Sequence, residues 1–105
     1  MSVRVVGLVT VNEEAASALA AYLRAVLPLL DAAGARIEQR FTVNEVVVGP
    51  RPATLVMILE FPSREAVDAL FGSPAYKALT ALRQEAFQSY QVSVVTDQSP
   101  IAEAE

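Results

Sequence analysis

The sequence predicts one α+β domain, in which four strands form an antiparallel sheet and the helices cover one face of it. Its 105 residues suffice for about one domain. The patterns along the chain run strand, helix, strand, strand, helix, strand. The first and third strand segments are apolar on both faces, whereas the second and fourth alternate between apolar and polar residues. The first and third strands are therefore expected in the middle of the sheet.

The first strand, residues 3–11, is rich in β-branched residues, as expected of a strand that is buried on both sides. Leucines, valines and alanines then recur at helical spacing up to Gly34. Thr10 and Glu13 fit a capping box at the start of this helix. Pro28 lies inside the pattern, where we expect a kink or a restart, and Gly34 supplies the left-handed position that ends the helix.

The second strand, residues 36–43, alternates and reads as an edge strand. A Gly-Pro-Arg-Pro segment, residues 49–52, breaks the chain before the third strand, residues 53–61. Ser63 can cap a short helix that ends at Gly72. Ser73 can cap a last helix with Pro74 at its first position, running to about Phe87.

The final strand covers residues 90–96 and completes the sheet. We expect the domain to span residues 1–97 and residues 98–105 to form a flexible acidic tail. A ferredoxin-like βαββαβ sheet places the first and third strands in the middle, so strand polarity favours that topology. The hydrophobic content of 53% exceeds what one small core can bury, which favours a homodimer.

Several short motifs carry a resemblance to a known family. They are Ala21-Tyr22, Ala33-Gly34-Ala35-Arg36, Glu60-Phe61-Pro62-Ser63, Ser73-Pro74-Ala75-Tyr76 and Arg83. With them the chain resembles the domain of unknown function 1330 family. The chain departs from the family pattern at Leu70-Phe71-Gly72, where an aromatic pair is usual, and at Gly34-Ala35, where a glycine pair is usual.

The resemblance implies a dimeric α+β barrel, in which two ferredoxin-like units pair sheet against sheet. It implies no catalytic residue, because the family is uncharacterised. More distant relatives by fold include cofactor-free monooxygenases, polyketide cyclases and isomerases, so function has to be argued from the site.

Composition excludes several function classes. The net charge is −4 and the eight basic residues are scattered, so we expect no nucleic-acid partner. The chain has no histidine and no cysteine, which argues against zinc and haem sites, and its four glycines form no phosphate loop. We therefore expect no cofactor.

No segment reads as a signal peptide or a membrane helix, which favours a cytoplasmic protein without a membrane partner. The alanine-rich, lysine-poor composition suggests a bacterial source.

Carboxylates, arginines and tyrosines remain as candidates for chemistry. If the second and third strands keep even positions together, Glu38 and Arg40 lie beside Val56, Ile58 and Glu60 and line the barrel interior. Burial would raise the pKa of Glu60 and make it an acid or base. The alternatives are an exposed charge or an ion pair with Arg83 for Glu60, and solvated edge or interface positions for Glu38 and Arg40.

Tyr76 and Arg83 share one shoulder of the last helix and can wall a cavity mouth, with Tyr22 as a further candidate from the first helix. Their alternative role is a dimer contact or packing against the sheet. In the leading hypothesis, Arg40 or Arg83 stabilises an enolate or phenolate and Tyr76 orients the ligand.

The sequence therefore favours a cofactor-independent enzyme of isomerase, cyclase or monooxygenase type. Its substrate would be a hydrophobic metabolite, with aromatic and polyketide-like molecules as candidates. The alternative is a non-catalytic module of the same fold that binds a small molecule or assists assembly.

Overall fold

The computed structural model describes residues 2–96 and contains four strands and four helices in that range. In chain order they are β1 (Val3–Val11), α1 (Ala16–Ala32), β2 (Arg36–Thr42), β3 (Leu55–Phe61), α2 (Arg64–Phe71), α3 (Pro74–Lys77), α4 (Thr80–Ala86) and β4 (Phe87–Val95). The predicted acidic tail, residues 98–105, lies outside the described residues.

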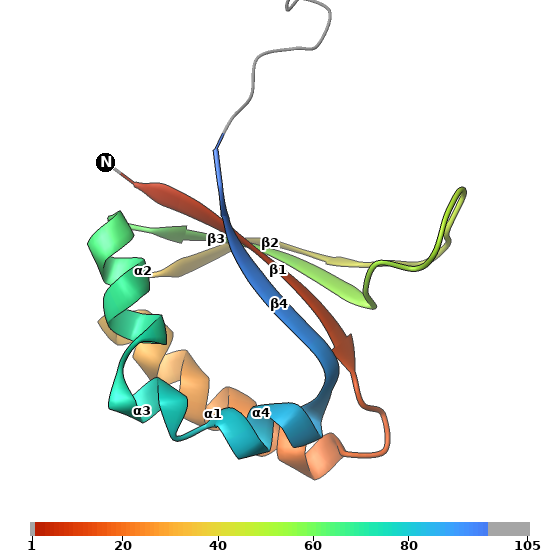
Figure 1. Ribbon diagram of the computed structural model, residues 1–105, viewed down its shortest axis with the longest axis horizontal. Helices are drawn as coiled ribbons and strands as arrows, with labels where there is room; N and C mark the ends of the chain where they lie inside the picture. The colour runs from red at the N-terminus through yellow and green to blue at the C-terminus, as the bar shows by residue number, and fades with distance from the viewer. Residues whose placement is uncertain (1, 97–105) are drawn as a thin grey trace, which may run out of the picture.

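The four strands form one antiparallel sheet in the order β2-β3-β1-β4. This order confirms the predicted ferredoxin-like topology, with β1 and β3, the strands that carry apolar residues on both faces, in the middle. Figure 1 shows that the helices gather on one side of the sheet and that the loop between β2 and β3 projects away from them. No helix within residues 2–96 is long and apolar enough to cross a membrane.

The two faces of the sheet have different surroundings. On β1, Val5 and Val9 are fully buried beneath the helices, and Val5 pairs with the buried Leu59 of β3. We call this side the helix face. Val6 pairs with Ile58 on the other side, the open face, which no helix covers (Figure 1). Each central strand therefore buries one apolar side and leaves the second available.

A β-bulge in β2 changes which side chains reach each face. Ile37 pairs with Leu59 and Gln39 pairs with Ile58, so Glu38 is the extra residue. Beyond it, Arg40 pairs with Met57 and Phe41 pairs with Val56. The expected register, with even positions together, is therefore wrong after Glu38, because side-chain direction reverses with each added residue. The open face gains Phe41 in place of Arg40.

The start of α1 also differs from the prediction. Thr10 belongs to β1 and pairs with Ser89, so it cannot cap a helix that begins at Ala16. Asn12 organises the turn instead: its Oδ1 accepts a hydrogen bond from the Glu14 N–H at 3.2 Å. The Asn12 N–H donates to the Ala86 carbonyl at 2.9 Å, and its Nδ2 donates to the Glu85 carbonyl at 3.2 Å. One side chain thus fastens the β1–α1 turn to the end of α4.

Both predicted serine caps are confirmed. The Ser63 hydroxyl accepts from the Ala66 N–H at 3.1 Å and starts α2. The Ser73 hydroxyl accepts from the Tyr76 N–H at 3.1 Å and starts α3, with Pro74 at its first position. The expected single last helix is wrong, because α3 ends at Lys77 and α4 starts at Thr80.

The first helix ends as predicted but continues through its proline. Gly34 has a φ of 77°, the left-handed conformation expected after a helix end. Pro28 lies inside α1, and the helix neither stops nor restarts there.

The Asn12 contacts lead to a stability prediction. We expect Asn12→Ala to lower the free energy of unfolding by about 1–2 kcal/mol, because it removes two side-chain hydrogen bonds at a chain turn. Urea denaturation would measure the change. The control is Asn44→Ala in the exposed β2–β3 loop, which should change stability by less than about 0.5 kcal/mol. Equal effects at both positions would show that the Asn12 contacts do not hold the turn.

Candidate functional site

The core beneath the sheet is divided into two clusters. Val5 belongs to one cluster with Phe61, and Val9 belongs to the other with Phe87. Gly7 lies between the two valines on the same face of β1, because side chains alternate along a strand. A glycine there supplies no side chain to join the clusters.

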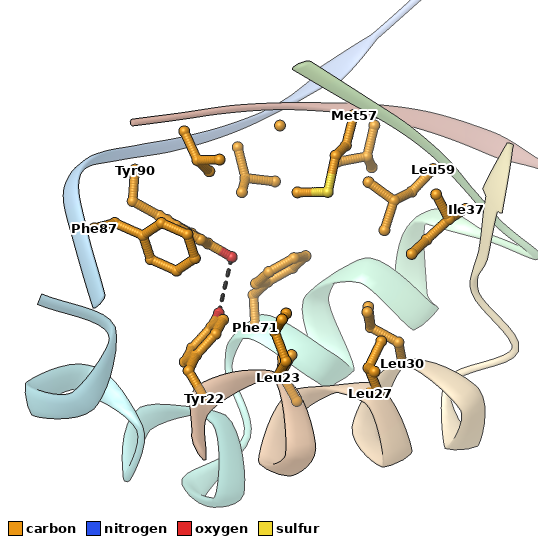
Figure 2. A pocket seen from close by; sticks show the side chains of 15 residues that line it. Tyr22, Leu23, Leu27, Leu30, Ile37, Met57, Leu59, Phe71, Phe87 and Tyr90 are labelled. Atoms are coloured by element: carbon orange, nitrogen blue, oxygen red, sulfur yellow. Dashed lines mark hydrogen bonds between the residues drawn. The ribbon is translucent and has the colours of Figure 1, made fainter. Parts of the chain in front are cut away.

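A cavity occupies the space next to Gly7. Its volume is about 80 Å³ for the centre of a water-sized sphere, several times what one water needs. Figure 2 shows it between the sheet and α1. The strands contribute Val5, Gly7, Val9, Ile37, Met57, Leu59, Phe87, Tyr90 and Val92. The helices contribute Tyr22, Leu23, Val26, Leu27, Leu30 and Phe71.

The polar side-chain atoms of this lining are the hydroxyls of Tyr22 and Tyr90, which meet at 3.1 Å (Figure 2). The Tyr76 hydroxyl bonds to the same Tyr90 oxygen at 3.1 Å from the side of α3. All three tyrosines of the chain therefore join in one cluster. The cavity has one polar end, where α1, α3 and β4 come together.

Arg83 supports this cluster from α4. Its Nη1 donates to the Tyr76 hydroxyl at 3.2 Å, and its guanidinium lies 5.5 Å from the centre of the Tyr76 ring and 5.1 Å from that of Tyr90. The Ser73 cap fixes the first turn of α3 and so the position of Tyr76. The Ser73-Pro74-Ala75-Tyr76 motif and Arg83 thus act together to build the polar end.

The hydroxyl cluster has one proton to spare. Three hydroxyls carry three protons, and two hydrogen bonds join the hydroxyls to each other. Arg83 is itself a donor to Tyr76 and accepts nothing. Whichever way the bonds run, one hydroxyl proton has no acceptor within the cluster. When the Tyr76 hydroxyl donates to Tyr90, that proton is on Tyr22 or Tyr90, the two members that line the cavity, and they can offer it to an acceptor inside the cavity.

Burial keeps these hydroxyls protonated. Removal from water raises the pKa of both Tyr22 and Tyr90 well above the ordinary value of a tyrosine. At neutral pH they are hydrogen-bond donors, not bases. The lining contains no carboxylate, amine or imidazole, and residues 2–96 contain no group of three acidic side chains placed to hold a metal ion.

The structure brings together three of the residues singled out from the sequence. Tyr22, Tyr76 and Arg83 form the polar end with Tyr90, which sequence reasoning missed. Gly7 was missed as well. The available signal was a glycine between Val5 and Val9 on one face of a central strand, a position where another group often approaches the backbone.

The carboxylate candidates lie elsewhere. Glu60 is on the open face, where it forms an ion pair with Arg36 of β2, not with Arg83. The hydrogen bond from Arg36 holds the pKa of Glu60 below the ordinary value, opposite to the direction expected from burial. Glu38 pairs with the Arg4 Nε at 3.4 Å. Neither carboxylate reaches the cavity of Figure 2.

The remaining candidates do not converge either. Arg40 is exposed on the edge strand and does not line the cavity. Val56 lies on the open face opposite Phe41. Ile58 borders a shallow open pocket on that face together with Glu38. Within residues 2–96 of this single chain these residues enclose no common cavity, and the predicted site inside a two-chain barrel stays a prediction.

Comparison with known proteins identifies a family. The sequence model of the family described as "Domain of unknown function (DUF1330)" matches residues 4–97. No curated protein matches the sequence.

Several solved structures share the fold. A protein of unknown function from Rhodopseudomonas palustris is 22% identical, with a TM-score of 0.77 over 94% of this chain and 84% of that one. SnoaB from Streptomyces nogalater, a cofactor-independent oxygenase, is 11% identical, with a TM-score of 0.63 over 95% and 96%. A dimeric protein of unknown function and ferredoxin-like fold from Bacteroides fragilis is 12% identical, with a TM-score of 0.57 over 90% and 94%.

The raised tyrosine pKa values predict a loss of stability in alkali. Unfolded tyrosines ionise near pH 10, whereas Tyr22 and Tyr90 resist ionisation when folded. The unfolded state then binds fewer protons than the folded state, so stability is complete below about pH 10 and falls as the pH rises further. Urea midpoints between about pH 8 and 11 would measure the fall.

The control is the double variant Tyr22→Phe, Tyr90→Phe, which keeps both rings in the core. Its stability should depend less steeply on pH over the same range. A slope as steep as that of the unchanged protein would show that these two hydroxyls are not the groups responsible.

Proposed function

We propose that this chain, which belongs to the domain of unknown function 1330 family, binds a small apolar molecule with one accepting oxygen in the cavity between α1 and the sheet. The observation that carries the proposal is the spare hydroxyl proton at the polar end of an otherwise apolar cavity. A buried donor without an acceptor costs about 1–3 kcal/mol, so a ligand oxygen at Tyr22 or Tyr90 would relieve that cost.

The same geometry supports a chemical role. A carbonyl or phenol oxygen bonded to Tyr22 or Tyr90 would be polarised, and negative charge that develops on it would be stabilised by the hydroxyls and by the Arg83 guanidinium behind them. Stabilising an enolate or phenolate is what a cofactor-independent isomerase, cyclase or monooxygenase requires. The cofactor-independent oxygenase SnoaB shares the fold, which supports catalysis as an option for this architecture.

A non-catalytic binding protein is the second candidate. The described lining has no side chain that can act as a base at neutral pH, and this favours binding without proton abstraction. Glu60, the acid or base expected from the sequence, lies on the opposite face of the sheet. A catalytic role would therefore rely on polarisation by Tyr22 and Tyr90, with solvent or the ligand accepting the proton.

Matched ligands test the proposal. Acetophenone has a carbonyl oxygen, and ethylbenzene has nearly the same shape without it. We expect the double variant Tyr22→Phe, Tyr90→Phe to bind acetophenone roughly three- to tenfold more weakly, the effect of one hydrogen bond, and ethylbenzene unchanged. Calorimetric titration would measure both affinities.

Tyr76→Phe is the control, since Tyr76 does not line the cavity and its loss still leaves one spare proton on the other two hydroxyls. Its effect on acetophenone should be smaller. If acetophenone does not bind, or binds equally to the double variant, the proposal fails. Exchange of the acetophenone methyl protons in D₂O separates the two roles, because an enzyme accelerates enolisation whereas a binding protein does not.

We also propose that the chain forms a homodimer through the open face of the sheet. Apolar side chains, among them Phe41, Val56 and Ile58, lie there without a helix over them, and Phe41 is 45% exposed. The structural neighbour from Bacteroides fragilis is described as dimeric, which supports the same assembly here. A second copy of the face would cover these side chains.

The proposed dimer predicts the effect of one charge on the open face. We expect the unchanged protein to sediment as a dimer and Ile58→Glu to sediment as a monomer at micromolar concentration, because the glutamate would be buried without a partner. The control Ala20→Glu places the same charge on the exposed side of α1 and should leave the dimer intact. A monomeric unchanged protein, or a dimeric Ile58→Glu, would contradict the proposed interface.

A further inference from the structure

We infer that the ligand is a slender molecule with one polar end, whose oxygen lies at Tyr22 and Tyr90 and whose apolar tail leaves the cavity past Leu23, Leu27 and Ile37. This inference rests on the proposed function, because it places the oxygen at the hydroxyl cluster. It goes further by giving the ligand an orientation, a width and an exit.

Exposure changes from one end of the cavity to the other. At the hydroxyl end, Tyr22 is 2% exposed and Phe87 is 7% exposed. At the other end, Leu27 is 48% exposed and Ile37 is 40% exposed, although both line the same cavity. Figure 2 shows Leu27 and Ile37 on the side of the cavity away from Tyr22 and Tyr90. The cavity is closed at its polar end and open at its apolar end.

Three exposed side chains border the open end of the cavity, and we call them the rim. They are apolar, although exposed side chains of a helix or an edge strand are usually polar. Within residues 2–96, seven large hydrophobic side chains are exposed, and three of them, Leu23, Leu27 and Ile37, line this one cavity. Leu23 and Leu27 are one helical turn apart on α1, so they form a continuous edge. An apolar edge continuous with an apolar cavity fits a ligand that is longer than the cavity, because its tail would cover these side chains.

The dimensions limit the width of the ligand. The cavity follows α1 from Tyr22 to Leu30, roughly 12 Å at the rise of an α-helix. A volume of about 80 Å³ over that length leaves a passage roughly 6 Å wide once the radius of a water is added. An alkyl chain or a single ring passes through such a space, whereas a ring system wider than one ring does not. The substrate class is therefore a linear or single-ring ketone or phenol.

A series of straight-chain methyl ketones tests the inference on the full chain. The carbonyl end stays constant while the tail grows from about five to about eleven carbons. We expect the dissociation constant to fall about fourfold for each CH₂ that becomes buried, and by smaller steps once the tail has passed the rim. 9-Acetylanthracene, whose three fused rings lie crosswise to the direction of its carbonyl, should bind more weakly than the longest of these ketones.

Rim variants locate the exit. Leu27→Gln and Ile37→Thr should weaken binding of the long ketones by roughly fivefold or more and leave acetophenone and the shortest ketone within about twofold, because only a long tail reaches the rim. The control Val48→Thr changes an exposed valine of the β2–β3 loop that does not line the cavity, and should affect neither group.

The outcomes separate this inference from the proposed function. If acetophenone binding depends on the hydroxyls but ketone affinity does not depend on length or on the rim, the proposed function stands and the exit is wrong. Tight binding of 9-acetylanthracene would overturn the narrow passage. If Leu27→Gln dissociates the dimer, a second copy covers the rim and the inference is overturned. If no ketone binds, the proposed function itself is wrong.

Discussion

The absence of a side chain at Gly7 determines how the interior of this domain is filled. Val5 and Val9 on either side of it are fully buried in different clusters, and the helices above have to span both. A Cβ at position 7 would lie 3.6 Å from the Met57 Cε, an ordinary contact, so the backbone does not demand a glycine there. The glycine matters through the space that it leaves, which a larger side chain would occupy at the expense of the cavity.

The hydroxyl cluster sits at one end of that space and links parts of the chain that are distant in sequence. Tyr22 comes from α1, Tyr76 from α3 and Tyr90 from β4, and Arg83 adds α4. Every hydroxyl oxygen of the cluster takes part in at least one hydrogen bond, and no buried side-chain nitrogen or oxygen within residues 2–96 is without a hydrogen-bond partner, although one hydroxyl proton still has no acceptor within the cluster. These hydrogen bonds join α1, α3, α4 and β4 at the polar end of the cavity.

Sequence patterns predicted the fold well and the site in part. Strand polarity and the caps at Ser63 and Ser73 depend on local chemistry, and the structure has them. Tyr76 and Arg83 were found because helical spacing places them on one side. The polar residues Glu38 and Glu60 led the sequence analysis to predict a site on the open face, inside a two-chain barrel, whereas the cavity of the single chain lies on the helix face. A sheet face as apolar as that of Met57 and Leu59 is normally filled by helix side chains. The cavity becomes apparent only once the structure shows that Met57 pairs with Gly7, which has no side chain to fill the space beside it.

The bulge at Glu38 determines which side chains of β2 lie on each face of the sheet. After it, Phe41 faces the side without helices and Arg40 faces the other. Deleting one residue near Glu38 would exchange the two, placing a guanidinium where the apolar ring now lies, while the helix side of β1 and β3 would keep its residues. A change in the length of β2 would therefore alter the open face, where we propose the dimer contact, and would leave the cavity residues of β1 and β3 in place.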